Sequence, residues 1–106
     1  MAKEIVWTIR ADKKFDSILE YLLSEWGESV TSAFVKKVYE FFDILSDFPE
    51  MGSVENKARN IRGFVLTKHI IVFYKIKGDT IILLNFFDKM AHYNEFPVYK
   101  AFTIYC

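Results

Sequence analysis

Apolar positions in the first half of this chain recur every three or four residues, a spacing typical of amphipathic helices. A first stripe follows Asp12, which suits a helix start because its carboxylate meets the positive end of the helix dipole. A second stripe begins near Ser29 and ends before Pro49, which disfavours a helical residue in front of it. The first stripe ends at Gly27, so the pattern predicts a tightly connected helical hairpin. The stripe residues are Phe15, Ile18, Leu19, Leu22 and Trp26, then Val30, Ala33, Phe34, Val38, Phe41 and Leu45.

The second half alternates with a period of two, which is typical of β-strands. Short polar breaks of hairpin length separate three runs rich in β-branched and aromatic residues, Gly63–Leu66, Ile70–Ile76 and Thr80–Phe87. In the middle run we expect one face to pack on the helices and the opposite face to carry His69 and Lys75. The packed face contains Ile70, Val72, Tyr74 and Ile76.

An earlier strand, Lys3–Thr8, should join this sheet, and 51–60 reads as a polar loop. The predicted class is therefore α+β: an N-terminal strand, an α-helical hairpin and a curled antiparallel sheet, in β-α-α-β-β-β order. Residues 1–106 fit one domain, since there is no room for a second core. The tail from about residue 89 is too aromatic for a disordered segment, so we expect Val98 to Tyr105 to pack on the domain or on a neighbouring molecule.

Hydrophobic residues make up 52% of the chain, which predicts either a large core or an apolar groove that awaits a partner. Cys106 is the only cysteine, which excludes an intramolecular disulfide and fits a reducing cytoplasm. We expect no membrane association, because no uninterrupted apolar stretch reaches spanning length. The residue spacing suggests no metal site and no phosphate-binding glycine loop, so no cofactor is predicted.

The zero net charge hides an asymmetry between the two halves of the chain. Residues 1–56 carry six Lys/Arg and eleven Asp/Glu, whereas residues 57–106 carry eight and three. The basic half contains the predicted sheet, so its open face, with His69 and Lys75 and with Arg62 and Lys68 nearby, could bind a polyanion such as RNA. A merely solvated basic surface is the alternative.

Several stretches in this order resemble the RelE/ParE superfamily of bacterial toxins, which are encoded beside an antitoxin. The opening IVWTIRADKKFDSILEYL and the following WGESVTSAFVKKV resemble the family's first strand and two helices. DFPEMG closes the second helix, IRGF opens the next strand, and KHIIVFYKI and IILLNFFD resemble the last two strands. The resemblance covers about residues 4–88 and implies a type II toxin whose partner is a cognate antitoxin.

The tail departs from the family pattern. After Asp88 the chain reads Lys-Met-Ala, without the arginine that many relatives place there, and AHYNEFPVY holds Tyr93 where ribonuclease members have arginine. By resemblance, Arg62 matches the family's arginine at the start of the second strand. His69 lies where members often place a basic residue.

The resemblance implies ribosome-dependent cleavage of messenger RNA by a metal-independent endoribonuclease as the default activity. In that reaction the substrate's own 2′-hydroxyl attacks the neighbouring phosphate, so the protein supplies a base, an acid and cations. The candidate catalytic residues are Arg62, His92, Tyr93 and Tyr99, and the candidate phosphate-binding residues are Lys68, His69, Lys75 and Lys89. Because Arg62 opens a strand beside a glycine, we expect its loss to cost little packing.

Two alternatives stay open at this point. One is a ParE-like inhibitor of DNA gyrase, and the other is a catalytically degenerate protein that only binds its antitoxin. In every case we expect the antitoxin to cover apolar surface around the hairpin and the sheet edge, and the chain to self-associate, for example as a homodimer, when the antitoxin is absent.

Overall fold

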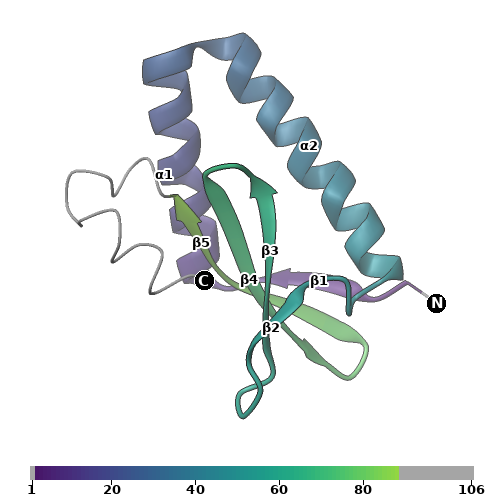
Figure 1. Cartoon of the computed structure of the whole chain (residues 1–106). Helices are drawn as coiled ribbons and strands as arrows, with labels where there is room; N and C mark the ends of the chain where they lie inside the picture. The colour runs from purple at the N-terminus through teal and green to yellow at the C-terminus, as the bar shows by residue number, and fades with distance from the viewer. Residues whose placement is uncertain (1, 89–106) are drawn as a thin grey trace.

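A computed structural model describes residues 2–88. The chain forms strand β1 (Glu4–Trp7), helices α1 (Ile9–Trp26) and α2 (Glu28–Asp47), and strands β2 (Ser53–Asn56), β3 (Ile61–Thr67), β4 (Ile70–Lys77) and β5 (Thr80–Asp88). The predicted α+β class and the order of strand, helical hairpin and sheet are confirmed (Figure 1). One short strand is additional: β2 lies within the stretch predicted as a polar loop, and all four of its residues are exposed.

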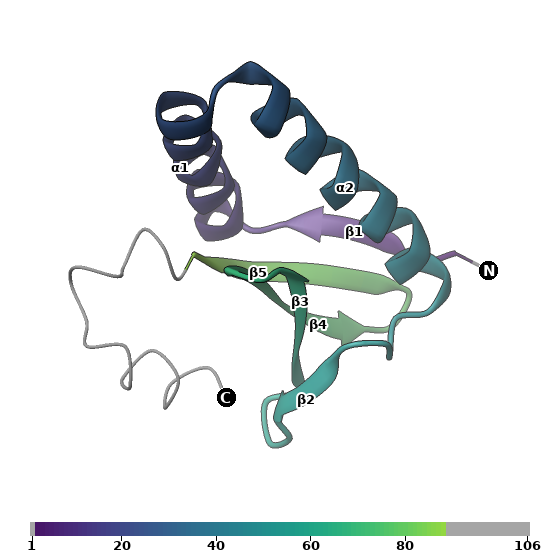
Figure 2. The ribbon, with the colours of Figure 1, turned by 45° about the horizontal axis from the view of Figure 1, so that its top comes forward.

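The five strands form one sheet in the order β1-β5-β4-β3-β2. The β3–β4 and β4–β5 pairs are antiparallel as expected, and the additional strand β2 also pairs antiparallel with β3. In contrast, β1 pairs with β5 in parallel, with Ile5 opposite Ile81. The sheet is therefore mixed. Both helices lie on one side of it, and no helix within residues 2–88 covers the other side, which we call the open face (Figure 2). No helix within residues 2–88 is long and apolar enough to span a lipid bilayer.

A capping residue fixes the start of the helical hairpin, and a glycine forms its turn. Thr8 caps α1, because its Oγ1 accepts a hydrogen bond from the Ala11 N–H at 3.1 Å. The same hydroxyl donates to the Leu83 carbonyl at 2.8 Å, which ties the cap to β5. The helix thus begins three residues before the predicted start at Asp12. Gly27 alone joins the helices, and its φ of 87° is a conformation that favours glycine.

Aromatic rings fill the space between the helices and the sheet. Trp7 from β1 contacts Phe15 of α1, Phe42 of α2 and Phe86 of β5, with ring centroids 5.2, 5.5 and 5.6 Å apart. Edge-on and tilted arrangements at these separations are favourable for aromatic pairs. Of the predicted packed face of β4, Ile70, Val72 and Tyr74 are buried in this core, and Ile76 packs against it. The prediction for that face is confirmed.

A β-bulge in β5 sets which of its side chains reach the core. Tyr74 pairs with Leu83 while Phe73 pairs with Asn85, so Leu84 is an extra residue in the ladder. The extra residue reverses the alternation beyond it. Phe86 therefore faces the helices, on the same side of the sheet as Leu83, and both are fully buried.

Candidate functional site

Arg62, the leading catalytic candidate, lies on the helix side of the sheet. It pairs across the strands with Tyr74, whose side chain is fully buried beneath the helices. The Arg62 Nη1 donates hydrogen bonds to the carbonyl oxygens of Gly52 at 2.9 Å and Glu50 at 3.1 Å. The guanidinium therefore holds the turn between α2 and β2. The expectation that its loss would cost little packing is wrong, because these bonds fasten that turn to the sheet.

Tyr74 completes the same tie, which we call the turn clasp: Arg62 and Tyr74 bound to the backbone of residues 49–52. The Tyr74 hydroxyl donates to the Pro49 carbonyl at 2.8 Å and accepts from the Gly52 N–H at 2.9 Å. Burial raises the pKa of this hydroxyl above its ordinary value, although the Gly52 bond and the Arg62 charge oppose the shift. The neutral phenol is thus favoured, as its donor role requires.

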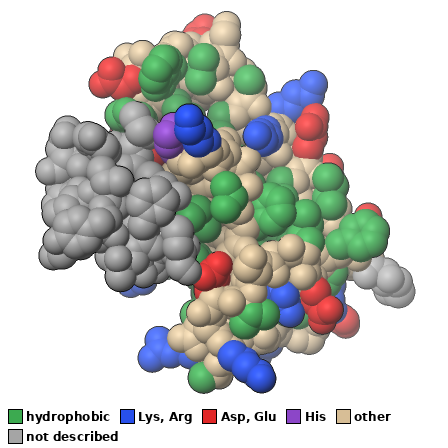
Figure 3. Space-filling model, in the orientation of Figure 1, with side chains coloured by type: hydrophobic (Ala, Val, Ile, Leu, Met, Phe, Trp, Pro, Cys, Tyr) green, Lys and Arg blue, Asp and Glu red, His purple; other side chains and the backbone are tan. Residues whose placement is uncertain are grey.

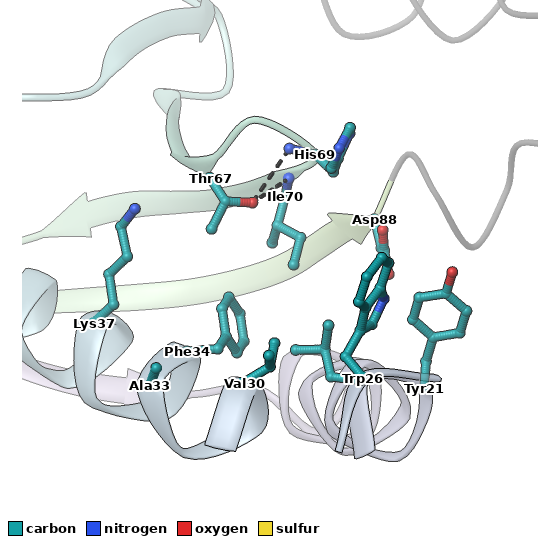
Figure 4. Close-up of a pocket in the computed structure, with 11 residues that line it drawn as sticks. Tyr21, Trp26, Val30, Ala33, Phe34, Lys37, Thr67, His69, Ile70 and Asp88 are labelled. Carbon is teal, nitrogen blue, oxygen red and sulfur yellow. Dashed lines mark hydrogen bonds between the residues drawn. The ribbon is translucent and has the colours of Figure 1, made fainter. Parts of the chain in front are cut away.

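Lys68 and His69 form the two-residue turn between β3 and β4. Thr67 Oγ1 accepts hydrogen bonds from the backbone N–H groups of His69 and Ile70, both at 3.2 Å, and so shapes the turn (Figure 4). His69 precedes the first residue of β4, so strand alternation does not place it on the same face as Lys75. Instead, its side chain lines a groove on the helix side.

That groove, which we call the hairpin-end groove, opens between the connected ends of α1 and α2 and the end of the sheet. It encloses about 350 Å³. Most of its surface is apolar, and polar groups lie at its edges, including Lys37 from α2 and Asp88 at the end of β5 (Figure 4). Hydrophobic side chains also gather on the outer surface of this end of the molecule (Figure 3). The lining residues are Tyr21, Leu22, Trp26, Val30, Ala33, Phe34, Lys37, Thr67, His69, Ile70 and Asp88.

Lys75 lies on the opposite, open side of the sheet, because it alternates with the inward-facing Tyr74. It lines a hollow with Arg59, Lys77 and Ile61. A neighbouring hollow shares Ile61 and Leu84 with the first and extends to Arg10, and a third continues along the start of α1. We call this continuous surface the open-face hollow. Its charged lining residues are Arg10, Lys13, Lys14, Glu55, Arg59, Lys75 and Lys77.

The candidate residues are therefore not gathered at one place within the described part of the chain. His69 and Lys75 lie six positions apart in sequence along β4 and its preceding turn, which corresponds to about 20 Å. Arg62 is on the helix side, and Lys68 is exposed in the turn. Lys89, His92, Tyr93 and Tyr99 lie outside the described residues, so their roles stay predictions. Among residues 2–88, no three potential metal ligands come together.

Sequence reasoning missed the basic residues that accompany Lys75. Arg10, Lys13 and Lys14 belong to the acidic half of the chain by composition, yet the parallel pairing of β1 with β5 brings the start of α1 beside the open face. Arg59 and Lys77 could have been found, because they precede and follow strands that were predicted to pair. Ile61, two residues after Arg59, pairs across the strands with Lys75, two residues before Lys77.

One comparison with known proteins identifies a family, and another identifies solved structures of similar fold. The sequence profile described as "ParE toxin of type II toxin-antitoxin system, parDE" matches residues 5–91. A chromosomal ParDE toxin-antitoxin system from P. aeruginosa contains a chain of similar fold, with 17% identity and a TM-score of 0.68 over 82% of this chain and 96% of that one. No curated protein sequence matches significantly.

Two further solved structures share the fold. A YoeB/ParE toxin from Agrobacterium tumefaciens is 12% identical, with a TM-score of 0.56 over 80% of this chain and 96% of that one. A conserved hypothetical protein from Helicobacter pylori is 18% identical, with a TM-score of 0.53 over 83% and 96% of the two chains. At these identities the likeness concerns the fold alone.

Proposed function

The chain belongs to the ParE toxin family of type II toxin-antitoxin systems, and from this premise we propose that it inhibits DNA gyrase until a cognate antitoxin binds it. The observation that carries the proposal is the ParE profile match, which runs from the first strand to just past the last. Within the superfamily, gyrase inhibition is the activity that a resemblance to ParE implies. A gyrase inhibitor needs a binding surface, and it does not need a hydrolytic site of its own.

One placement in the structure supports this choice over a ribonuclease, and a second provides a binding surface. The Arg62 guanidinium, which a ribonuclease would use to stabilise charge on the phosphate, is bound to carbonyl oxygens of the turn clasp. The open-face hollow combines six basic side chains with one acidic residue, Glu55, so it suits an anionic surface. Gyrase acts while bound to DNA, and the phosphates of that DNA are such a surface. We assign the open-face hollow to contact with the gyrase–DNA complex.

Ribosome-dependent cleavage of messenger RNA is the second candidate, because the same open-face hollow would also suit RNA phosphates. In this reading Lys75 holds phosphate, and the proton-transferring groups come from His92, Tyr93 and Tyr99, with Lys89 as a further cation. Lys68 and His69 lie just before the start of β4, where they would contact a neighbouring stretch of the RNA.

The family assignment also supports a cognate antitoxin as partner. Three apolar side chains on the second half of α2 and just after it remain exposed, Tyr39, Ile44 and Phe48. We propose that an amphipathic segment of the antitoxin covers this surface, and that self-association, for example as a homodimer, covers it when the antitoxin is absent.

Two assays on the purified chain separate the candidates. With supercoiled plasmid, gyrase and ATP, we expect gyrase-dependent DNA cleavage that added antitoxin suppresses. Cleavage of translated messages with intact plasmid would favour the second candidate instead. No activity in either assay, from a chain that still binds its antitoxin, would leave only the antitoxin-binding role.

A matched pair of charge reversals tests the surface. We expect the Lys75→Glu, Lys77→Glu variant to weaken the gyrase effect by roughly tenfold or more, which corresponds to about 1.4 kcal/mol of lost binding. Lys36→Glu makes the same kind of change on the solvent side of α2, where the Lys36 side chain is largely exposed. It should leave the gyrase effect unchanged. Equal activity of all three proteins would remove the open-face hollow from the proposal.

A further inference from the structure

We propose that the C-terminal segment 89–106 binds back into the hairpin-end groove of its own chain. The groove is a partly open hollow of about 350 Å³, and most of its lining surface is apolar. The strand that ends in the groove leads directly into the segment. Such an intramolecular contact would form whichever target the toxin has.

The groove presents apolar surface that nothing within residues 2–88 covers. Trp26, at the end of α1, is 62% exposed, and Val30, on the first turns of α2, is 44% exposed. Both line the groove together with Leu22, Phe34 and Ile70 (Figure 4). Contiguous exposed apolar surface of this kind marks an interaction site more often than isolated exposed side chains do. The shape is a trough between a helix pair and a strand end, so it suits a short apolar stretch of chain.

The composition of residues 89–106 fits that trough. The segment carries a charge at only three positions at neutral pH, Lys89, Glu95 and Lys100. A stretch with so many apolar and aromatic residues gains free energy by burying them in an apolar groove. Its large apolar residues are Met90, Tyr93, Phe96, Val98, Tyr99, Phe102, Ile104 and Tyr105.

The point of attachment favours an intramolecular contact. Asp88 is the last residue of β5 and also lines the groove, so residue 89 starts at the groove itself. Eighteen residues follow, which could span roughly 60 Å when extended and therefore reach every part of the lining. A short tether holds the segment at an effective concentration of about millimolar, far above that of free protein in an assay. The chain's own segment should therefore occupy the groove before a second copy does.

Paramagnetic labelling of the full chain tests the contact. The native thiol is removed by Cys106→Ser, a new one is placed in the segment by Ala101→Cys, and a nitroxide is attached there. We expect the methyl signals of Val30 and Ile70, in the groove, to lose most of their intensity. The methyl signals of Ile44, near the end of α2, and of Val54, in β2, should keep theirs. Uniform weak losses over the surface, or losses centred on the open face, would overturn the proposal.

Two controls identify the occupant. In a mixture of isotope-labelled chain without nitroxide and unlabelled chain with nitroxide, the groove signals should remain intact. Their loss would mean that a second copy fills the groove, which contradicts an intramolecular contact. Adding Phe102→Ser and Ile104→Ser to the labelled chain should restore the Val30 and Ile70 signals, whereas adding Lys100→Ser should not. Restoration by all three changes alike, or by none, would also count against the proposal.

Discussion

Removing one hydroxyl from the turn clasp should destabilise the whole domain. Tyr74→Phe keeps the ring in the core but leaves the buried Gly52 N–H without the acceptor that it has at 2.9 Å. An unpaired buried donor costs about 1–3 kcal/mol, and the lost bond to the Pro49 carbonyl costs about 0.5–1.5 kcal/mol. Because water can reach the turn in part, we expect the free energy of unfolding to fall by about 2–3 kcal/mol.

Urea denaturation followed by circular dichroism measures this loss directly. For a chain of 106 residues, the expected change corresponds to a melting temperature lower by roughly 10–20 °C. Tyr39→Phe is the matched control, because it deletes the same atom from a ring that is 54% exposed on α2, and it should change the free energy of unfolding by less than about 0.5 kcal/mol. Equal losses in the two variants, or no loss in either, would refute the assignment of the turn clasp as a stabilising unit.

Three other measurements test the structure. Burial raises the pKa of Tyr74, so as pH rises the unfolded chain loses this proton before the folded chain does. The free energy of unfolding should therefore fall as pH rises above about 10, and it should fall less steeply in Tyr74→Phe. Denaturation at several pH values measures both slopes. Arg62→Ala should lower the free energy of unfolding by about 1–3 kcal/mol, since it removes charged hydrogen bonds to Glu50 and Gly52, and an unchanged urea midpoint would contradict this. Thr8→Ala removes the cap of α1 and a bond to Leu83, so we expect a loss of about 1–2 kcal/mol and earlier amide exchange in the first turn of α1.

The revised role of Arg62 changes how its variants must be interpreted. A loss of toxicity in Arg62→Ala would not by itself indicate catalysis, because the turn clasp would be weakened at the same time. Arg62→Lys is informative here, since lysine keeps the charge on a side chain that is one bond shorter and ends before the position of Nη1, the atom that donates to both carbonyl oxygens. Toxicity should follow stability across the two variants. A variant that is stable yet non-toxic would return Arg62 to the functional site.

Features with local causes were predictable from the sequence. The three- and four-residue spacing of Phe15, Ile18 and Leu22 was enough to identify α1, and Pro49 marked the end of α2 to within two residues. The alternation in β4 correctly identified which residues face the helices. Each of these signals arises from neighbours along the chain, so a single sequence carries it in full.

Features that depend on distant pairing were not predictable. The parallel contact of β1 with β5 joins Ile5 to Ile81, and it brings Arg10 to the open face. Strand β2 is short and exposed, so it has no hydrophobic pattern to reveal it. The direction of the Arg62 side chain follows from its cross-strand partner, and the sequence did not fix that register. His69 left the predicted face because it belongs to a turn, where alternation does not hold.

Action of the chain on gyrase, which we propose for this member of the ParE family, can be tested with purified components. Supercoiled plasmid is incubated with purified gyrase, ATP and the toxin, then treated with detergent and protease, and the linear DNA is quantified on a gel. We expect linear DNA to increase with toxin concentration, to require gyrase, and to disappear when antitoxin is added in excess. Plasmid that stays intact at every toxin concentration, while the same preparation cuts translated messages, would rule out gyrase as the target and favour messenger RNA.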